Sequence, residues 1–357
     1  MSPHFNCTYM ALIPKVDNPE VASQFRHIAL CNFGYKILTK IISNRLKLFM
    51  SDLITENQSA FVSGRQIQDN ILVVHEYFHR LKMLRTGTNG ELALKLDMNK
   101  AYDRVDWHFL EKVLLKMGFQ LSWVRIVMDC VSSVSMALII NGSLGKRFQP
   151  SRGLHQGDPL SPFLFLFING VLSSMINKMC DQNVLDAVRI TENGPLVSHF
   201  FFADDSLFFL KASLYNCETL SDTFHLYCTT SGQSINVNKS SLYFSPNTRQ
   251  EIVHLLSLVL NMKAVDDPGM YLGLPTVWGR SKVAALKYVK EKINKRIVGW
   301  NSSSLTQAGK EIMIKAVAFT VPAYPMMVFK FPNSLCNQIS SSLSKFWWGN
   351  SHSSGVH

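Results

Sequence analysis

The segment from Phe200 to Leu210 constrains the fold of this chain most, because two short apolar runs meet there at Asp204-Asp205. Apolar runs on either side of turn-forming residues predict a tight β-hairpin with both carboxylates at its tip. Like charges this close raise each other's affinity for protons, so we expect something cationic beside the tip. An Asp-Asp pair is also an ordinary turn dipeptide, so other parts of the sequence must decide whether it is functional.

A second strand is predicted from Glu91 to Leu96, where leucines alternate with other residues, and this half-buried strand delivers Asp97 at its carboxyl end. Oxygen-only ligands favour Mg²⁺ or Mn²⁺. With Asp97 as the third carboxylate, two ions could sit about 3.5 to 4 Å apart for in-line phosphoryl displacement. One ion would lower the pKa of a primer 3′-hydroxyl, and the other would screen a triphosphate and the leaving pyrophosphate.

Helical spacing marks further segments. Asp106 is the expected N-cap of a helix that ends at Gly118, and a core helix is expected from Ser161, with Pro162 in its first turn, to Met179. Nearer the N-terminus, a helix is expected to have an apolar face and a basic, solvated face, formed by Ile37, Ile41 and Leu48 and by Lys36, Lys40 and Lys47 respectively.

Turn residues cluster at 266–269 and predict a joint before a helical C-terminal segment, with a boundary near residue 280. The helical segment is expected to have an apolar side and a basic side. The two sides consist of Val283, Leu286, Ile293, Ile297 and Trp300, and of Lys287, Lys290 and Lys295. The Ser-rich end, residues 349–357, is expected to be disordered.

The chain has 36 Lys and Arg against 25 Asp and Glu, a net charge of +11 that attracts nucleic acid or an anionic membrane surface. We expect an intracellular protein without a membrane span, because no secretion signal is recognisable and no stretch reaches about 18 to 20 apolar residues. The seven scattered cysteines form no CxxC pair and are expected to be reduced thiols. Oligomeric state and the choice between nucleus and cytoplasm stay open.

Several strings along the chain, in this order, resemble the reverse transcriptases of non-LTR (LINE-type) retrotransposons, especially the plant ones. These strings are LIPK (12–15), FRHIAL (25–30), QSAFVSGRQIQDN (58–70), LKLDMNKAYDRVDW (94–107), RGLHQGDPLSP (152–162), FFADD (201–205), SGQSINVNKS (231–240), YLGLP (271–275) and FWWG (346–349).

The resemblance implies an α+β right-hand polymerase, with fingers at 1–90, a palm with an antiparallel sheet at 91–279 and a helical thumb at 280–348. The reverse transcriptase domain as a whole would cover about residues 5–279. It further implies an RNA template, a DNA primer, dNTP substrates and two Mg²⁺ or Mn²⁺ ions.

Site residues follow from the same resemblance. Asp97, Asp204 and Asp205 match the metal ligands and Lys239 a lysine that could protonate pyrophosphate. The positions that match nucleotide-binding residues are Lys15, Arg26, Tyr102 as the steric gate against a ribose 2′-hydroxyl, Gln156 and Gly157. The primer-grip turn is matched by Tyr271, Leu272 and Gly273.

Two positions depart from the usual motifs, since His27 stands where relatives usually have Pro and His155 where many have Arg. No endonuclease segment precedes the domain and no Cys/His-rich segment follows it, so we expect a piece of a longer element protein. Two alternatives to an active reverse transcriptase stay open. One is a catalytically inactive remnant that still binds nucleic acid. The other is an RNA-dependent RNA polymerase, which Ala203 and Tyr102 fit poorly.

Overall fold

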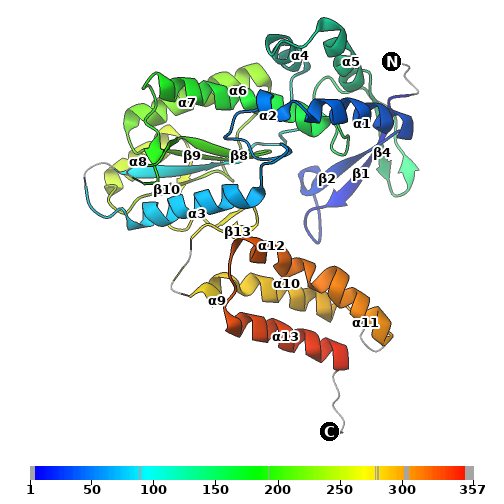
Figure 1. Ribbon diagram of the computed structural model, residues 1–357. Helices are drawn as coiled ribbons and strands as arrows, with labels where there is room; N and C mark the ends of the chain where they lie inside the picture. The colour runs from blue at the N-terminus through cyan, green and yellow to red at the C-terminus, as the bar shows by residue number, and fades with distance from the viewer. Residues whose placement is uncertain are drawn as a thin grey trace. The chain divides into compact units, whose positions relative to one another are not determined.

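The structure is a computed structural model that describes residues 5–87, 90–191, 193–277, 279, 281–300 and 305–349. The expected disordered tail therefore lies outside the described residues, apart from Gly349. The described chain is α+β, as expected, and divides into two compact units (Figure 1). The first unit comprises residues 1–67 and 80–266, and the second comprises residues 68–79 and 267–357. The expected division into fingers, palm and thumb stays a prediction.

A five-stranded sheet organises the first unit, in the order β11-β10-β3-β9-β8. Its strands are β3 (Glu91–Leu96), β8 (His199–Phe202), β9 (Asp205–Lys211), β10 (Ser241–Phe244) and β11 (Lys263–Ala264). β3 is antiparallel to both β9 and β10, and β8 and β9 form the predicted hairpin. A two-stranded ribbon, β6 (Val188–Arg189) with β7 (Leu196–Val197), lies outside this sheet.

The expectation of a half-buried β3 was wrong, because β3 is the central strand and both of its faces are covered. Leu92, Ala93 and Leu94 are each at most 1% exposed, although Ala93 points to the opposite face from the two leucines. The leucine face packs in one core with the helices drawn above the sheet in Figure 1. The alternation of leucine with alanine therefore showed only which side chains share a face of the sheet. It did not show that the other face is exposed, since alanine is small enough to be buried as well.

Helices of the first unit pack around this core. They are α1 (Phe33–Lys47), α2 (Met50–Leu53), α4 (Trp107–Lys116), α5 (Leu121–Ser132), α6 (Ser161–Asp181), α7 (Leu214–Ser231) and α8 (Gln250–Val259), while α3 (Ile67–Met83) is divided between the units. α4 has the predicted cap, since the Asp106 carboxylate accepts the amide hydrogen of Phe109 at 2.8 Å. α6 begins at Ser161 as predicted.

A second, smaller sheet has the order β2-β1-β4-β5 and leads into α1. Its strands are β1 (Cys7–Pro14), β2 (Phe25–Cys31), β4 (Ser135–Ile140) and β5 (Ser143–Leu144), and the 3₁₀ turn η1 (Ala22–Gln24) precedes β2. The predicted apolar face of α1 was wrong. Ile37, Ile41 and Leu48 are 47%, 48% and 75% exposed, and the helix instead buries a face that includes Tyr35, Thr39, Ile42, Ser43 and Leu46.

The second unit combines a short hairpin with a helical bundle. The hairpin joins β12 (Met270–Tyr271) to β13 (Leu274–Pro275). The helices are α9 (Lys282–Ala285), α10 (Lys287–Val298), α11 (Gln307–Met313), a π-helical segment (Ile314–Ala318), α12 (Thr320–Val328) and α13 (Asn333–Trp348). The expected apolar side is confirmed at Leu286 and Ile293, both fully buried, but the helix is broken into two at Leu286.

Two helical stretches, Ser161–Asp181 and Gln307–Val328, are long and apolar enough to cross a membrane. The expectation that no stretch reaches this length and composition was therefore wrong. Buried core helices meet the same criterion, and Leu164, Phe165 and Ile168 on α6 are each at most 1% exposed within the first unit.

Candidate active site

The β8–β9 turn carries two of the predicted carboxylates, but only Asp204 lies in the turn itself. Phe202 pairs with Asp205 across the hairpin, so Ala203 and Asp204 are the two central residues and Asp205 is the first residue of β9. The prediction that both aspartates lie at the tip was therefore wrong for Asp205, which lies one residue beyond the turn. Ala203 has a φ of 54°, and a positive φ at the first central residue is typical of type II′ hairpin turns.

Strand register brings Asp97 to this turn. β3 pairs with β9 up to Leu96 and Ser206, so the next position along both strands sets Asp97 beside Asp205. The pKa of Asp97 is raised by partial burial and by the negative charge of Asp204, and the pKa of Asp205 is raised by burial, then by Asp204 and also by Asp97. The three carboxylates therefore form one electrostatic cluster.

Two lysines offset this negative charge. Lys239, which is exposed, lies near Asp97 and acts to lower its pKa, and Lys95 acts in the same direction on Asp97 and Asp205. The loop before β10 holds the backbone of Asp97 in place. The Asp97 amide donates a hydrogen bond to the Ser240 hydroxyl, and the Asp97 carbonyl accepts one from the Asn236 amide. Lys239 thus lies in the loop that holds the backbone of Asp97, and its predicted role toward pyrophosphate stays a prediction.

The donor set of this cluster consists of carboxylate oxygens alone, which suits hard divalent cations such as Mg²⁺ and Mn²⁺. Burial and, after it, repulsion from Asp204 raise the pKa values of Asp97 and Asp205, and a bound cation would offset both effects. Within the described residues, no three His, Cys, Asp or Glu side chains are already arranged as a metal-ligand group. The residues therefore fit such ions by the chemistry of their donor atoms.

Two buried amide side chains hold the backbone of Ala203. The Gln58 carbonyl oxygen accepts the Ala203 amide hydrogen at 3.0 Å, and Asn169 on α6 donates to the Ala203 carbonyl at 2.8 Å. Gln58 and Asn169 are 1% and 2% exposed. The Arg65 guanidinium fixes the loop of Gln58 by donating to four backbone carbonyls, those of Ser51, Ile54, Thr55 and Gln58. The turn that carries Asp204 is therefore positioned from outside its own sheet.

Tyr102, the predicted steric gate, lies near the same turn. Its ring stacks on Phe165 of α6, with centroids 4.8 Å apart and planes 16° apart. Its pKa is raised mainly by burial and further by the charge of Asp204. Stacking on a buried aromatic ring restricts the rotation of Tyr102, which a residue that sets the width of a pocket requires.

The predicted triphosphate contacts lie apart from the carboxylates, on the β1–β2 hairpin. Arg26 is an exposed residue of β2, and Lys15, just beyond β1, is exposed with its ammonium donating to the Ser23 carbonyl at 3.0 Å. The structure does not bring either side chain into contact with the aspartates. Lys15 and Arg26 could therefore act on the reaction only if a bound nucleotide reaches from the carboxylates to the β1–β2 hairpin.

Gln156 and Gly157 pack against β2. The Gln156 carbonyl accepts the Ala29 amide hydrogen at 2.9 Å. Gly157 has a φ of +114°, and a Cβ at this position would stand 3.1 Å from the Ala29 carbonyl oxygen. The neighbouring His155 is 5% exposed, and burial lowers its pKa to about 4, so this imidazole is neutral at pH 7.

His27, the residue that departs from the usual motif, has a specific partner. Its Nε2 lies 2.7 Å from the Asp103 carboxylate, next to Tyr102, and both side chains are about one quarter exposed. This contact and the Ala29–Gln156 hydrogen bond connect β2 to the loops around the carboxylates. Sequence reasoning noted the substitution at His27 but missed the pair.

Within the second unit, the predicted primer-grip residues form the β12–β13 turn. Leu272 and Gly273 both have positive φ, 47° and 78°, as in type I′ turns. Their carbonyls accept hydrogen bonds from the hydroxyls of Tyr324 and Tyr288, and the Tyr271 hydroxyl donates to Asn70. The three residues are thus fixed to three helices, α12, α10 and the part of α3 that belongs to their own unit.

Sequence reasoning missed Gln58, Asn169, Ser240 and Lys95. Lys95 left a signal, because a charged residue two positions before Asp97 interrupts the apolar run that begins at Leu92. Gln58 belongs to a recognisable string, but nothing in that string indicates that its side chain reaches Ala203. Such contacts join residues far apart along the chain and depend on the tertiary structure.

The antiparallel pairing of the central strand with the adjacent hairpin gathers three carboxylates beside a stacked tyrosine, an arrangement suited to metal-dependent phosphoryl transfer. The particular family follows from sequence comparison. Residues 13–276 match the family described as reverse transcriptase (RNA-dependent DNA polymerase), and the chain belongs to this family.

Relatives include proteins of non-LTR retrotransposons. The chain is 30% identical over 232 residues to an uncharacterized 149 kDa protein of transposon TX1 from Xenopus laevis, covering 65% of this chain and 17% of that protein. It is 26% identical over 230 residues to a Pol polyprotein of the type-1 retrotransposable element R2 from Popillia japonica, covering 64% of this chain and 31% of the polyprotein. The chain thus spans less than a third of either relative.

A plant relative and a solved structure are also similar to the chain. An uncharacterized mitochondrial protein of Arabidopsis thaliana is 33% identical over 123 residues, which cover 30% of this chain and 88% of that protein. Apo telomerase from Candida tropicalis superposes with a TM-score of 0.49 at 14% identity, over 97% of this chain and 62% of that one.

Proposed function

We propose that the chain performs RNA-templated DNA synthesis for a LINE-type retrotransposon, by transferring a nucleotide from a dNTP to a primer 3′-hydroxyl. The observation that carries this proposal is the cluster of Asp97, Asp204 and Asp205 next to Tyr102, within a chain of the reverse transcriptase family. The motif strings and the Arabidopsis relative support an element of plant type. An intracellular location, in nucleus or cytoplasm, belongs to the same proposal.

The chemistry assigns a role to each group. Bound at the three carboxylates, two Mg²⁺ or Mn²⁺ ions would activate the primer hydroxyl and neutralise charge on the triphosphate. Asp97, Asp204 and Asp205 hold the negative charge that positions those ions. Lys239 acts against the burial that raises the pKa of Asp97 and so favours its ionised form, and it can give a proton to the leaving pyrophosphate.

Substrate selection is assigned to Tyr102, and contacts with the substrates are assigned to residues elsewhere in the two units. Tyr102, held by Phe165, crowds a ribose 2′-hydroxyl and so favours dNTP over NTP. Lys15 and Arg26 provide a point charge and a bidentate donor for the triphosphate. Gln156 and Gly157 contact the nucleotide and the template, and the Tyr271-Leu272-Gly273 turn holds the primer strand.

The test is primer extension on an RNA template with Mg²⁺ or Mn²⁺. Wild-type protein is expected to incorporate dNTPs, and Asp204→Asn to reduce the rate by at least about 10²- to 10³-fold, because a charge that stabilises the transition state is lost. Asp106→Asn is the matched control, since Asn also caps a helix and Asp106 lies outside the cluster.

Two results would contradict the proposal. A wild-type chain that binds template-primer but incorporates no dNTP with either metal would be an inactive remnant. Incorporation of NTPs faster than dNTPs would indicate an RNA polymerase. The Tyr102→Ala variant adds a direct check, because it is expected to increase NTP use relative to dNTP use.

A further inference from the structure

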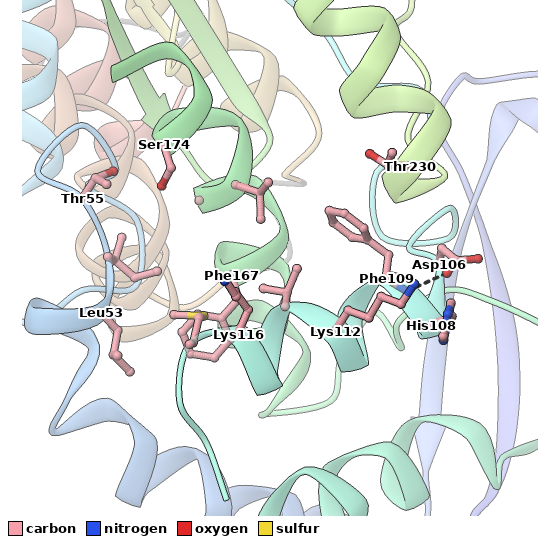
Figure 2. A pocket seen from close by; sticks show the side chains of 15 residues that line it. Leu53, Thr55, Asp106, His108, Phe109, Lys112, Lys116, Phe167, Ser174 and Thr230 are labelled. Carbon is pink, nitrogen blue, oxygen red and sulfur yellow. Dashed lines mark hydrogen bonds between the residues drawn. The ribbon is translucent and has the colours of Figure 1, made fainter. Parts of the chain in front are cut away.

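A groove between α4 and α6 in the first unit encloses a volume of about 680 Å³. Figure 2 shows Leu53 and Thr55 at one end and Asp106, His108 and Thr230 at the other. None of the residues that line it belongs to the carboxylate cluster or to the nucleotide-binding positions. The proposed polymerase function therefore assigns it no role.

The floor of the groove is apolar. Ile54, Val113 and Phe167 line it and are each at most 9% exposed. On α6 the groove is widened at Gly170, which has no side chain. A Cβ added there would have Ile54 as its nearest neighbour, at 4.0 Å. The missing side chain leaves space that an incoming apolar side chain can fill.

One rim of the groove is basic. His108, Lys112 and Lys116 are spaced by four residues along α4, so they lie in one row beside the apolar wall, and all three are exposed. The groove has one acidic lining residue, Asp106, whose carboxylate already accepts the Phe109 amide hydrogen as the helix cap. An apolar floor beside the positive charges of Lys112 and Lys116 complements a ligand that is apolar on one side and acidic along its edge.

We propose that this groove binds an acidic amphipathic helix, with apolar side chains inserted between α4 and α6 and carboxylates along the row of His108, Lys112 and Lys116. Helix-in-groove recognition places anchors at i, i+3, i+4 and i+7, a spacing that runs along the length of α4. Phosphate groups of a nucleic acid would satisfy the lysines but would leave the apolar floor unfilled, so the lining favours a peptide.

The test uses a fluorescein-labelled helical peptide of about 14 residues, long enough for the i to i+7 anchors, with leucines at those positions and glutamates on both flanks, and the full chain as receptor. Fluorescence anisotropy is expected to show saturable binding. A peptide with lysines in place of the glutamates is expected to bind at least about tenfold more weakly, because its charges meet the basic rim.

Two variants examine the floor and the rim separately. Gly170→Leu adds a side chain in the groove, with no close contact at its Cβ, and is expected to weaken binding at least about tenfold, as is the double variant Lys112→Glu/Lys116→Glu. Lys178→Glu, an exposed lysine of α6 outside the groove, is the control and is expected to change binding less than about twofold. Thermal unfolding of each variant checks that it is folded.

Equal binding of the acidic and basic peptides, or unchanged binding to folded Gly170→Leu, would overturn the proposal. Displacement of the peptide by oleate at lower concentration than by unlabelled peptide would assign the groove to a lipid-like anion instead. Sedimentation that shows a dimer abolished by Gly170→Leu would assign it to a second copy of the chain. Primer-extension activity, which depends on other residues, is expected to be the same in wild type and Gly170→Leu.

Discussion

Ala203 stands at the point where the backbone must turn so that Asp204 projects from the sheet. Its φ of 54° is unfavourable for residues with a Cβ, and glycine would avoid that cost. The amide and carbonyl groups of Ala203 are held by Gln58 and Asn169, so surrounding hydrogen bonds stabilise the strained turn. At this scale, side chains without any role in the chemistry determine where a catalytic carboxylate lies.

Gln58→Ala is expected to lower kcat by about tenfold or more with a smaller change in KM, because Ala203 loses its acceptor and Asp204 is displaced. The free energy of unfolding is expected to fall by about 1–3 kcal/mol, the cost of leaving a buried amide hydrogen unpaired. Steady-state primer extension and thermal unfolding measure the two effects. Exposed Gln66→Ala is the control, and a Gln58→Ala enzyme with wild-type kcat would exclude the positioning role.

Elements differ in how well the sequence predicted them. Asp97 and the β8–β9 hairpin were predicted because apolar runs and turn residues are local signals. The face of α1 was not, because Ile37 and Ile41 have the same helical spacing as the residues that are buried, Tyr35, Thr39 and Ile42. Helical periodicity predicts that one face of a helix is buried, whereas the neighbouring elements decide which face it is.

The β1–β2 hairpin has a side-chain connection to the loop that carries Tyr102, and this connection can be tested. His27→Ala and Asp103→Asn are each expected to raise the KM for dNTP by about three- to tenfold with a smaller effect on kcat, since a partly exposed charge-assisted hydrogen bond is lost. The double variant is expected to be no worse than either single variant. Fully additive effects in this cycle would show that the two residues act independently.

Buried histidines make the stability of the first unit depend on pH. His199, between the hydroxyls of Ser173 and Ser198, is fully buried and has a pKa lowered by burial to about 3, and that of His155 is lowered to about 4. The unfolded chain, with ordinary pKa values near 6.5, binds protons first as the pH falls. Stability is therefore retained above about pH 6.5 and is lost towards pH 4.

Between pH 7 and pH 4, each of these histidines is expected to lower the free energy of unfolding by about 3 kcal/mol. Urea unfolding at several pH values measures this dependence. His199→Gln is expected to show a shallower loss than wild type between pH 6.5 and 4. Buried Asp158, whose pKa is raised, acts in the opposite direction, so the difference between the two proteins isolates His199. Parallel curves would mean that His199 is not buried in its neutral form.

For the molecule as a whole, the net charge of +11 favours nucleic acid as a partner. On α10, Lys292 and Lys295 are exposed and belong to the unit that carries the predicted primer-grip turn. Affinity for an RNA–DNA template-primer is expected to fall steeply between about 50 and 200 mM salt. Lys292→Ala and Lys295→Ala are each expected to reduce the slope of log K against log salt by about 1.

Fluorescence anisotropy with a labelled template-primer measures these slopes, and Lys178→Ala on α6 is the control. Slopes that stay at the wild-type value in both α10 variants would show that this helix does not contact the phosphate backbone. A reduced slope in the control alone would move the contact to the first unit.

The sequence by itself determined the strand that ends at Asp97, the aspartate hairpin and the capped helix α4, because turn residues, caps and apolar periodicity act over a few neighbouring positions. The α+β class followed from the resemblance of its motif strings to a known family. Only the tertiary structure decided that Gln58 and Asn169 hold Ala203, that His27 meets Asp103, and that β3 is buried on both faces. It also decided that α4 and α6 leave a groove open beside a basic row. These features join residues distant along the chain, and their free energy depends on packing and strand register that local patterns do not encode.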